Sequence, residues 1–430
     1  APVTPVTDPE TGEYNTKTLY YNGLISLRDA SLSQTSFRSL ANAYGAYEII
    51  KGLTFRSEFG TDILDLREKN YWGRLTITGG PAGEAQARSV RVVNYNWENY
   101  LTLNKTFDIH NINIIGGMSY QESRTFGSNI EAKGFPTDDF TNIQNASEAK
   151  VFSSWEQATT YLSYFARGNY KIDDKYFFTI SGRVDGSSRF GVDNRFGFFP
   201  AASAGWIISQ EDFMSSVKAT LSYLKVRASY GITGNSGIPD YAHMALFDGV
   251  NYAGKNGLDP IQLMSRELGW ENTAQIDFGL DFGFFNNRFT GEIDFYHKKT
   301  TDLLLYRTLP ATSGYEGVWS NVGELENKGI EFAIHSNNFS GKFVWTTDFN
   351  MAFNRNKIID INGPEITPNG ISYVMEGQPI GVFKIARFAG ADPDNGDALF
   401  YVEAGSDETT NNYNLAEPQI VGSPNPDFTG

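Results

Sequence analysis

The sequence predicts an all-β protein, in the form of an antiparallel transmembrane β-barrel. Stretches of about ten residues alternate between apolar and polar side chains, which is the period of a strand with two different faces. The stretches come in pairs, with a very short turn inside each pair and a long connection between pairs. Aromatic residues make up 14% of the chain. Such rings form the interface girdles of membrane barrels, although they also favour strands in soluble proteins.

The turns are sorted by length between the two ends of the predicted hairpins. The tight turns fall at Lys51-Gly52, Asp108 to Asn111, Asp173-Asp174, Asn286-Asn287 and Ser340-Gly341. The long connections are predicted at 64–92, 122–157, 234–270 and 301–325. Outer-membrane barrels have short turns at one end and long, outward-facing loops at the other. A soluble β-sandwich has no physical reason to sort its loops in this way.

The predicted hairpins can be followed in order along the chain. Those at 41–64 and 95–121 alternate less regularly than the hairpin at 161–185, in which Tyr164 and Phe178 lie on an apolar face. The next pair joins 196–209 to 220–233 through a connection with room for a short helix. The hairpins at 274–299 and 328–353 repeat the clear alternation. The prediction is therefore about twelve spanning strands, each of a length that crosses a bilayer at a tilt of about 45°.

Composition excludes several classes of protein. The chain has 430 residues, a formal net charge of −15 and no cysteine. The negative charge argues against nucleic acid as a partner, because phosphate binding needs clustered Lys and Arg. The absence of cysteine excludes a disulfide framework and Cys-ligated metal sites. No apolar run approaches the roughly 18 residues that a membrane helix needs, so a helical membrane protein is excluded whereas a barrel is not.

No arrangement of residues predicts an enzyme. The histidines are scattered without metal-ligand spacing, at His110, His243, His297 and His335. The chain has no Gly-x-Ser-x-Gly nucleophile elbow. The glycines at 231, 234 and 237 do not lie between a strand and a helix, so they do not predict a dinucleotide site.

Candidate binding residues lie at the long-loop end of the predicted strands. One group follows a strand in a Gly- and Ser-rich loop and comprises Arg189, Asp193, Asn194 and Arg195. These side chains either contact a ligand or partner, or they fix a rigid turn through ion pairs, and the rigid turn is the favoured interpretation. Further aromatic candidates are Tyr241, Trp270 and Tyr373, each equally suited to packing against its own loop.

One short segment resembles the start of a calcium-binding loop. Its oxygen-bearing side chains are those of Asp392, Asp394, Asn395 and Asp397. The distal bidentate Glu of such loops is missing at the expected place, and no helix precedes the segment. An ordinary turn is therefore the favoured interpretation, with calcium as the alternative, and no other cofactor is predicted.

Three segments have a distinctive sequence, order and spacing. They are Arg183-Val-Asp-Gly-Ser-Ser-Arg-Phe-Gly191, continuing through Asn194-Arg-Phe-Gly-Phe-Phe-Pro200 to Gly205-Trp-Ile-Ile-Ser209; Asn321-Val-Gly-Glu-Leu-Glu-Asn-Lys-Gly-Ile-Glu331; and Gly422-Ser-Pro-Asn-Pro-Asp-Phe-Thr-Gly430. Together they resemble the SusC-like (SusC/RagA) branch of TonB-dependent outer-membrane transporters. The resemblance covers nearly the whole chain and is weakest before Tyr44.

The resemblance also implies parts that this sequence does not contain. Members of the family carry a plug domain, a segment that contacts TonB and several further strands after the last motif. About 12 of the 22 strands expected by resemblance are visible, so residues 1–430 are expected to form the central part of one barrel domain.

By resemblance, the expected function is TonB-dependent import of a bulky nutrient, an oligosaccharide or a peptide, across the bacterial outer membrane. The expected partners are a SusD-like surface lipoprotein that covers the outer face, TonB as the source of energy, and the lipid around the barrel. The loops at 234–270 and 355–430 are expected to contribute to the partner contact. Two alternatives stay open: a non-transporting structural barrel subunit of an outer-membrane assembly or secretion complex, and a soluble glycan-binding β-domain.

Overall fold

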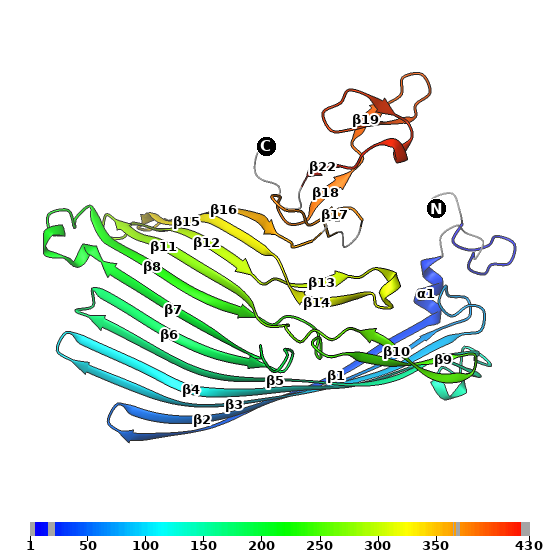
Figure 1. Cartoon of the computed structure of the whole chain (residues 1–430), viewed down its shortest axis with the longest axis horizontal. Helices are drawn as coiled ribbons and strands as arrows, with labels where there is room; N and C mark the ends of the chain where they lie inside the picture. Colours follow the sequence, from blue (N-terminus) through cyan, green and yellow to red (C-terminus); the bar gives the residue numbers. More distant parts are fainter. Residues whose placement is uncertain (1–4, 16–21, 364, 367–369, 423–430) are drawn as a thin grey trace. The chain divides into compact units, whose positions relative to one another are not determined.

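The computed structural model describes residues 5–15, 22–363, 365–366 and 370–422. Most of these residues lie in strands and in the connections between them (Figure 1). The strands of the large sheet are β1 (Ala30–Ile50), β2 (Leu53–Trp72), β3 (Glu84–Phe107), β4 (His110–Lys133), β5 (Glu148–Ile172), β6 (Tyr176–Ser187), β7 (Phe196–Ile207), β8 (Leu221–Asn235), β11 (Glu271–Phe284), β12 (Phe289–Thr301), β15 (Glu324–Ser340) and β16 (Val344–Asp360).

The remaining elements are short. The smaller strands are β9 (Leu246–Tyr252), β10 (Lys255–Gln262), β13 (Leu304–Thr308), β14 (Gly317–Asn321), β17 (Ser372–Tyr373), β18 (Val382–Ile385), β19 (Phe388–Ala391), β20 (Ala398–Tyr401), β21 (Thr409–Thr410) and β22 (Gln419–Gly422). The helices are α1 (Gly23–Asp29) and the 3-10 turns η1 (Ile143–Asn145), η2 (Ile208–Gln210), η3 (Asp212–Met214), η4 (Ala311–Ser313) and η5 (Tyr413–Leu415). No described helix is both long and apolar enough to span a membrane.

Twelve strands hydrogen-bond in the order β1-β2-β3-β4-β5-β6-β7-β8-β11-β12-β15-β16. This order confirms the prediction of about twelve strands that pair with their neighbours along the chain. The order skips β9, β10, β13 and β14 because these strands form two separate hairpins inside the connections after β8 and β12. All five tight turns lie where the sequence predicts them. The room for a helix between β7 and β8 is taken up by η2 and η3.

The predicted lengths of two connections are wrong. The stretch 64–92 is mostly strand, because β2 continues to Trp72 and β3 begins at Glu84. The stretch 122–157 is also mostly strand, since β4 continues to Lys133 and β5 begins at Glu148. β2 to β5 are thus 20 to 25 residues long. Their outer halves carry polar side chains on both faces, so apolar alternation, which reports burial of one face, did not reveal them.

The chain divides into two compact units. The first comprises Ala1–Ile49, Thr54–Tyr100 and Met118–Leu162, and the second comprises Ile50–Leu53, Leu101–Gly117 and Ser163–Gly430. The first unit therefore holds most of β1 and β2 and the long-loop parts of β3 to β5. The second holds the tight turns and all strands from β6 onward.

In the second unit, the register aligns apolar side chains from strand to strand on one face. One row runs through Phe178, Ala204, Ala228, Phe278, Phe295, Ile330 and Phe353. The next row runs through Tyr176, Trp206, Val226, Leu280, Ile293, Phe332 and Met351. Phe278 is 52% exposed and Ile293 is 42% exposed. A face of this kind is the lipid-facing surface of a membrane barrel.

The opposite face of the same strands carries paired charges. Arg227 on β8 donates from Nε to Asp281 at 2.9 Å and from Nη2 to Asp294 at 2.7 Å. A Cβ on residue 279 would lie only 2.5 Å from Cζ of the Arg227 guanidinium. Glycine at this position therefore makes room for the arginine to reach carboxylates on two neighbouring strands. This polar face is the one that lines the lumen of such barrels.

Aromatic residues gather at the tight-turn end of the second unit. Ring contacts connect Phe282, Phe284, Phe285 and Phe289 around one turn, and Phe339, Phe343 and Trp345 around another. Beside them, Tyr176 and Trp206 both donate to the Glu211 carboxylate, at 2.5 and 2.9 Å. These hydrogen bonds, that from Tyr176 first, lower the pKa of Glu211. The position fits a girdle at a membrane interface.

An arginine introduced on the apolar face should destabilise the protein more than an arginine introduced on the polar face. Ile293→Arg or Phe278→Arg should destabilise the folded barrel by about 2–4 kcal/mol, because a midplane arginine on the lipid face is costly. The matched changes Glu292→Arg and Asp277→Arg, one residue away on the polar face, should cost clearly less. Equilibrium unfolding of the protein in lipid bilayers measures the free energy of unfolding of each variant. An equal loss of this free energy on the two faces would contradict the assignment of lipid and lumen sides.

Candidate functional site

The candidate site of the second unit is a group of loops around a small buried core. Phe190, Ile238, Ala242 and Leu268 are buried together, and Trp270, Leu304 and Trp319 pack against them. These residues come from the connections after β6, β8 and β12, so three loops that are far apart in sequence share one core. We call this group the Phe190 cluster. It holds most of the binding candidates that the sequence suggested.

Arg189 links two loops of the Phe190 cluster. Its Nε donates to Asp240 at 2.8 Å and its Nη1 donates to the carbonyl of Ser236 at 3.0 Å. The carbonyl of Arg189 lies 3.0 Å from Nδ1 of His243. The Arg189 and Asp240 side chains are 24% and 17% exposed, so their ion pair is largely shielded from water. These contacts support the interpretation of Arg189 as the anchor of a rigid turn, and Asp240 is a partner that the sequence pattern did not reveal.

The neighbouring motif residues anchor the same loops through backbone contacts. Asn194 donates from Nδ2 to the carbonyl of Glu267 at 2.7 Å. The indole Nε1 of Trp270 donates to the carbonyl of Arg195 at 3.0 Å. Asp193, in contrast, is exposed and has no ion pair among the described residues. Asp193 is therefore the member of this motif with a side chain that is available to a ligand or partner.

Trp270 packs against its own loops. Its ring contacts Phe190 and Phe199 at centroid distances of 5.1 and 5.2 Å. A Cβ at Gly197 or Gly234 would collide with the Phe199 or Trp270 ring. Glycine at these two positions therefore lets the rings lie flat against the ends of β7 and β8, which explains the Phe-Gly-Phe-Phe order of the motif.

Asn321 fastens the second family-like segment to the Phe190 cluster. Its Oδ1 accepts from the backbone N–H of Gly269 at 2.7 Å, and its Nδ2 donates to the carbonyls of Gly269 and Asp302 at 2.9 and 3.0 Å. One side chain thereby connects the loop after β12 to the loop before β11. The sequence motif pointed to this segment, but the anchoring role of Asn321 depends on a contact with Gly269, a residue 52 positions away in the sequence. The third family-like segment lies outside the described residues from 423 onward.

The other two aromatic candidates are not members of this buried core. Tyr241 is half-buried with a φ of +64°, and its carbonyl accepts from Nε2 of Gln262 at 3.0 Å. Tyr373 on β17 lies under the ammonium group of Lys384 at 5.4 Å. The structure thus gives each a local contact, and a direct role in binding stays a prediction for both.

The calcium candidates form a turn between β19 and β20. Asp392 Oδ1 accepts from the backbone N–H of Asp394, and Asn395 Oδ1 accepts from that of Asp397. The backbone N–H of Asp392 donates to the carbonyl of Asp397 at 2.8 Å. Within the described ranges, no group of three or more His, Cys, Asp or Glu side chains is arranged to hold a metal ion. The oxygens are thus used to close the turn, and calcium binding stays an untested alternative.

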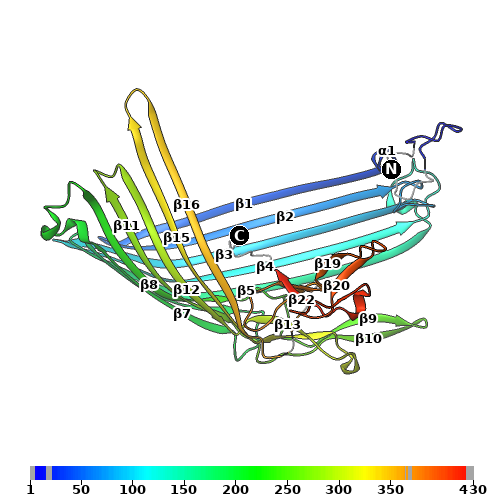
Figure 2. The same cartoon turned by 90° about the horizontal axis from the view of Figure 1, so that it is seen from above.

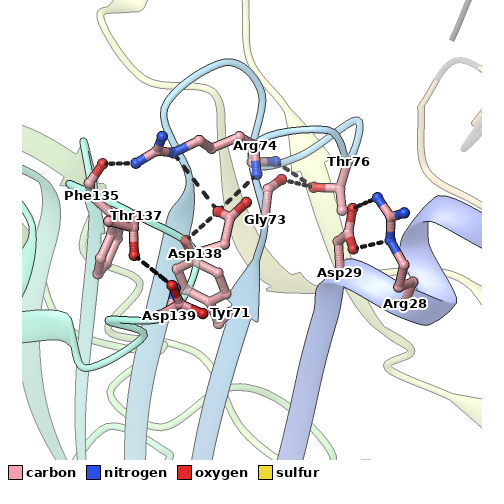
Figure 3. Close-up of polar contacts among 11 residues, drawn as sticks. Arg28, Asp29, Tyr71, Gly73, Arg74, Thr76, Phe135, Thr137, Asp138 and Asp139 are labelled. Atoms are coloured by element: carbon pink, nitrogen blue, oxygen red, sulfur yellow. Dashed lines mark hydrogen bonds and ion pairs between the residues drawn. The ribbon is translucent and has the colours of Figure 1, made fainter. Parts of the chain in front are cut away.

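The first unit has a second loop cluster, which Figure 3 shows. The hydroxyl of Tyr71, at the end of β2, donates to Asp138 Oδ1 at 2.8 Å. The same carboxylate accepts the backbone N–H of Arg74 at 3.2 Å, and Arg74 Nη2 donates to the carbonyl of Phe135 at 2.7 Å. Tyr71 also packs edge-on against Phe135 in a small buried core. The loops 73–83 and 134–147 are therefore fastened to one another, and none of these residues had been singled out from the sequence.

A groove of about 550 Å³ lies along the strands of the first unit. Its lining combines apolar groups, including Leu40, Ala41 and Tyr95, with amides, hydroxyls and the carboxylates of Asp62 and Glu122. Asp62 is held by Arg38 at 2.8 Å. The amide and hydroxyl groups offer both donors and acceptors beside apolar surface.

Comparisons with known proteins agree on one family. Residues 4–429 match the family model described as TonB dependent receptor-like, beta-barrel. The chain is 35% identical over 423 residues to the TonB-dependent receptor P3 of Formosa agariphila, and the aligned residues make up 90% of this chain and 42% of that protein. It is 37% identical over 267 residues to the TonB-dependent receptor SusC of Bacteroides thetaiotaomicron, and the aligned residues make up 60% of this chain and 26% of that protein.

A solved structure is also similar over nearly the whole chain. The structure of the RagAB peptide transporter superimposes with a TM-score of 0.86 at 28% sequence identity. The superposition covers 96% of this chain and 47% of that chain. The chain therefore spans less than half the length of these relatives.

The cluster in Figure 3 predicts graded losses of local stability. Tyr71→Phe removes one hydrogen bond and should weaken the loop contact by about 0.5–1.5 kcal/mol. Asp138→Ala leaves a buried hydroxyl and a backbone N–H without their acceptor and should cost about 1–3 kcal/mol. Hydrogen exchange of the amides at 73–83 and 134–147 measures the opening. Thr137→Ala, which removes only the contacts of its hydroxyl with Asp139, is the control and should leave the exchange unchanged at every amide other than that of Asp139.

Substitutions of Arg189 and of Asp193 should affect amide exchange in the loop 236–245 differently, because only Arg189 anchors this loop. Arg189→Ala should raise amide exchange in the loop 236–245 tenfold or more, because a shielded charge-assisted contact is worth about 1.5–3 kcal/mol. Asp193→Ala should leave that exchange unchanged. If Arg189→Ala left the loop protected, its role as an anchor would be wrong.

Proposed function

This chain belongs to the TonB-dependent receptor β-barrel family, and on that premise we propose that it supplies wall and outer loops to an importer of a bulky nutrient. The family places it in the bacterial outer membrane. The observation that carries the proposal is the superposition of 96% of the chain on a transporter of the SusC/RagA type. The strand order and the sorted loops agree with that assignment.

The proposed cargo is an oligosaccharide or a peptide. The relative RagAB is described as a peptide transporter, and the groove of the first unit offers amide and hydroxyl groups beside apolar side chains, which suit either class. Transport of a bulky cargo needs a wide polar passage, and large plugged barrels provide one. The charged face around Arg227 suits the wall of such a passage.

The proposed partners are a SusD-like surface lipoprotein that covers the outer face and TonB, which supplies energy from the other side. The loops of the Phe190 cluster and the described residues after β16, at 361–363, 365–366 and 370–422, emerge at the long-loop end, where such a lipoprotein would lie. Loops on a rigid scaffold are common binding surfaces. We propose no catalytic step, since the relatives named above are receptors and transporters.

The test is to purify the full-length protein gently from its own outer membrane and to identify what accompanies it. Transport predicts a SusD-like lipoprotein in equal amount and the loss, on deletion of the gene, of growth on one glycan or peptide. Copurification with assembly or secretion machinery and no nutrient phenotype would favour a structural barrel subunit instead. A protein that partitions into the soluble fraction would contradict both.

A further inference from the structure

The connection between β8 and β11 carries a hairpin that no other described element covers. It consists of β9 and β10, which form a two-stranded sheet of their own in the described part of the chain. Figure 2 shows the hairpin extending beyond the ends of β8 and β11. Every residue from Phe247 to Asp259 is exposed. We call this hairpin the outer arm.

The outer arm is well formed at both of its ends. The two residues of its turn, Ala253 and Gly254, have φ values of +51° and +77°, which is typical of the primed turns that match the twist of a hairpin. Asn251 Oδ1 accepts from the N–H of Gly254 at 3.0 Å. At the base, Gln262 Nε2 donates to the carbonyls of Tyr241 and Met244 at 3.0 and 2.8 Å. The arm is therefore a defined element mounted beside the Phe190 cluster.

One face of the outer arm exposes apolar side chains near its base, and Asn251 and Asn256 lie on the same face nearer the turn. Phe247 lies opposite Pro260, and Gly249 lies opposite Leu258, so these side chains share one side of the two strands. Phe247 is 60% exposed and Leu258 is 76% exposed. A lone two-stranded hairpin is marginally stable in water unless its apolar face packs against something. The arm therefore lacks a covering surface for these residues.

The other face carries two carboxylates directly opposite one another, with Val250, Tyr252 and Lys255 nearer the turn. Asp248 pairs in register with Asp259, and like charges in this position destabilise a hairpin. Neither forms an ion pair with a described residue. A cationic group from outside the described chain would relieve the repulsion. A second copy of this chain would instead bring the same carboxylates and a net charge of −15.

The free edges of the arm disfavour strand addition by a partner. Pro260 lacks a backbone N–H, and the charged residues of both strands are of the kind that blunts exposed edges. A partner is therefore recognised through side chains on the two faces of the arm rather than through a shared sheet.

We propose that the outer arm is a docking element for the surface lipoprotein, which receives Phe247, Leu258 and Pro260 in an apolar pocket and places Lys or Arg beside Asp248 and Asp259. This inference rests on the proposed function, because it assigns a contact surface to the partner named there. It adds that the partner's facing surface is basic around an apolar pocket.

The experiment uses the full-length protein in its own outer membrane, with the lipoprotein expressed at its normal level. The double variant Phe247→Ser and Leu258→Ser removes the apolar face, and Asp248→Lys with Asp259→Lys reverses the charge of the other face. The matched control is Val192→Ser, which removes an apolar side chain that is 75% exposed from the loop after β6, outside the arm. The readouts are the ratio of lipoprotein to barrel after gentle purification and the heat-modifiable mobility of the barrel.

Each double variant of the arm should lower the copurified lipoprotein at least tenfold, while the control stays within twofold and the barrel mobility is unchanged in all. Full retention of the lipoprotein by both arm variants would overturn this inference and leave the proposed function standing. A wild-type protein without any lipoprotein would overturn both. Crosslinking of the arm to a second copy of the chain would identify self-association and contradict the proposed partner.

Discussion

Backbone hydrogen bonding inside hydrocarbon is the constraint on which the rest of this structure depends. A bilayer offers no water to an unpaired N–H or C=O, so each strand that crosses it needs a neighbour on both sides. β6, β7, β8, β11, β12 and β15 meet this demand, since each lies between two hydrogen-bonded neighbours, and β16 is the last described strand of the sheet. Pro200 has no backbone N–H to donate, and it is compatible with this demand because the described pairing of β7 with β8 begins one residue later, at Ala201. Once the ladder is fixed, the pleat places apolar rows on one face and the Arg227 network on the other.

The sequence predicted the membrane-crossing part of the fold well, because that part is subject to a simple rule. Where one face meets lipid, residues must alternate, and the strands and tight turns of the second unit follow directly from the alternation. The outer halves of β2 to β5 were assigned to loops because water wets both of their faces. No alternation is required there, so the pattern contained nothing that could reveal the strands.

The loop clusters could be predicted only in part. Arg189, Asn194 and Trp270 were recognised as unusual residues, but their partners lie 51 to 75 residues away in the sequence. A local pattern cannot specify which carbonyl or carboxylate will be reached over such distances. Tyr71 and Asp138 were missed for the same reason. Their contacts mainly hold three loops together, as the favoured interpretation of the motif as a rigid turn expects, and exposed elements such as the outer arm remain to meet other molecules.

The length of β2 to β5 has a consequence for how this protein can change over evolutionary time. At roughly 3.3 Å per residue and a tilt near 45°, a strand of more than 20 residues rises well above an apolar band about 25 Å tall. Inside that band, an insertion of one residue would turn every following side chain to the wrong face. Above it, both faces are wet, so an inserted residue costs little more than a local bulge. Natural variants should therefore accumulate length changes in the outer parts of these strands, where phages and antibodies reach the cell surface, while the membrane-crossing parts keep their length.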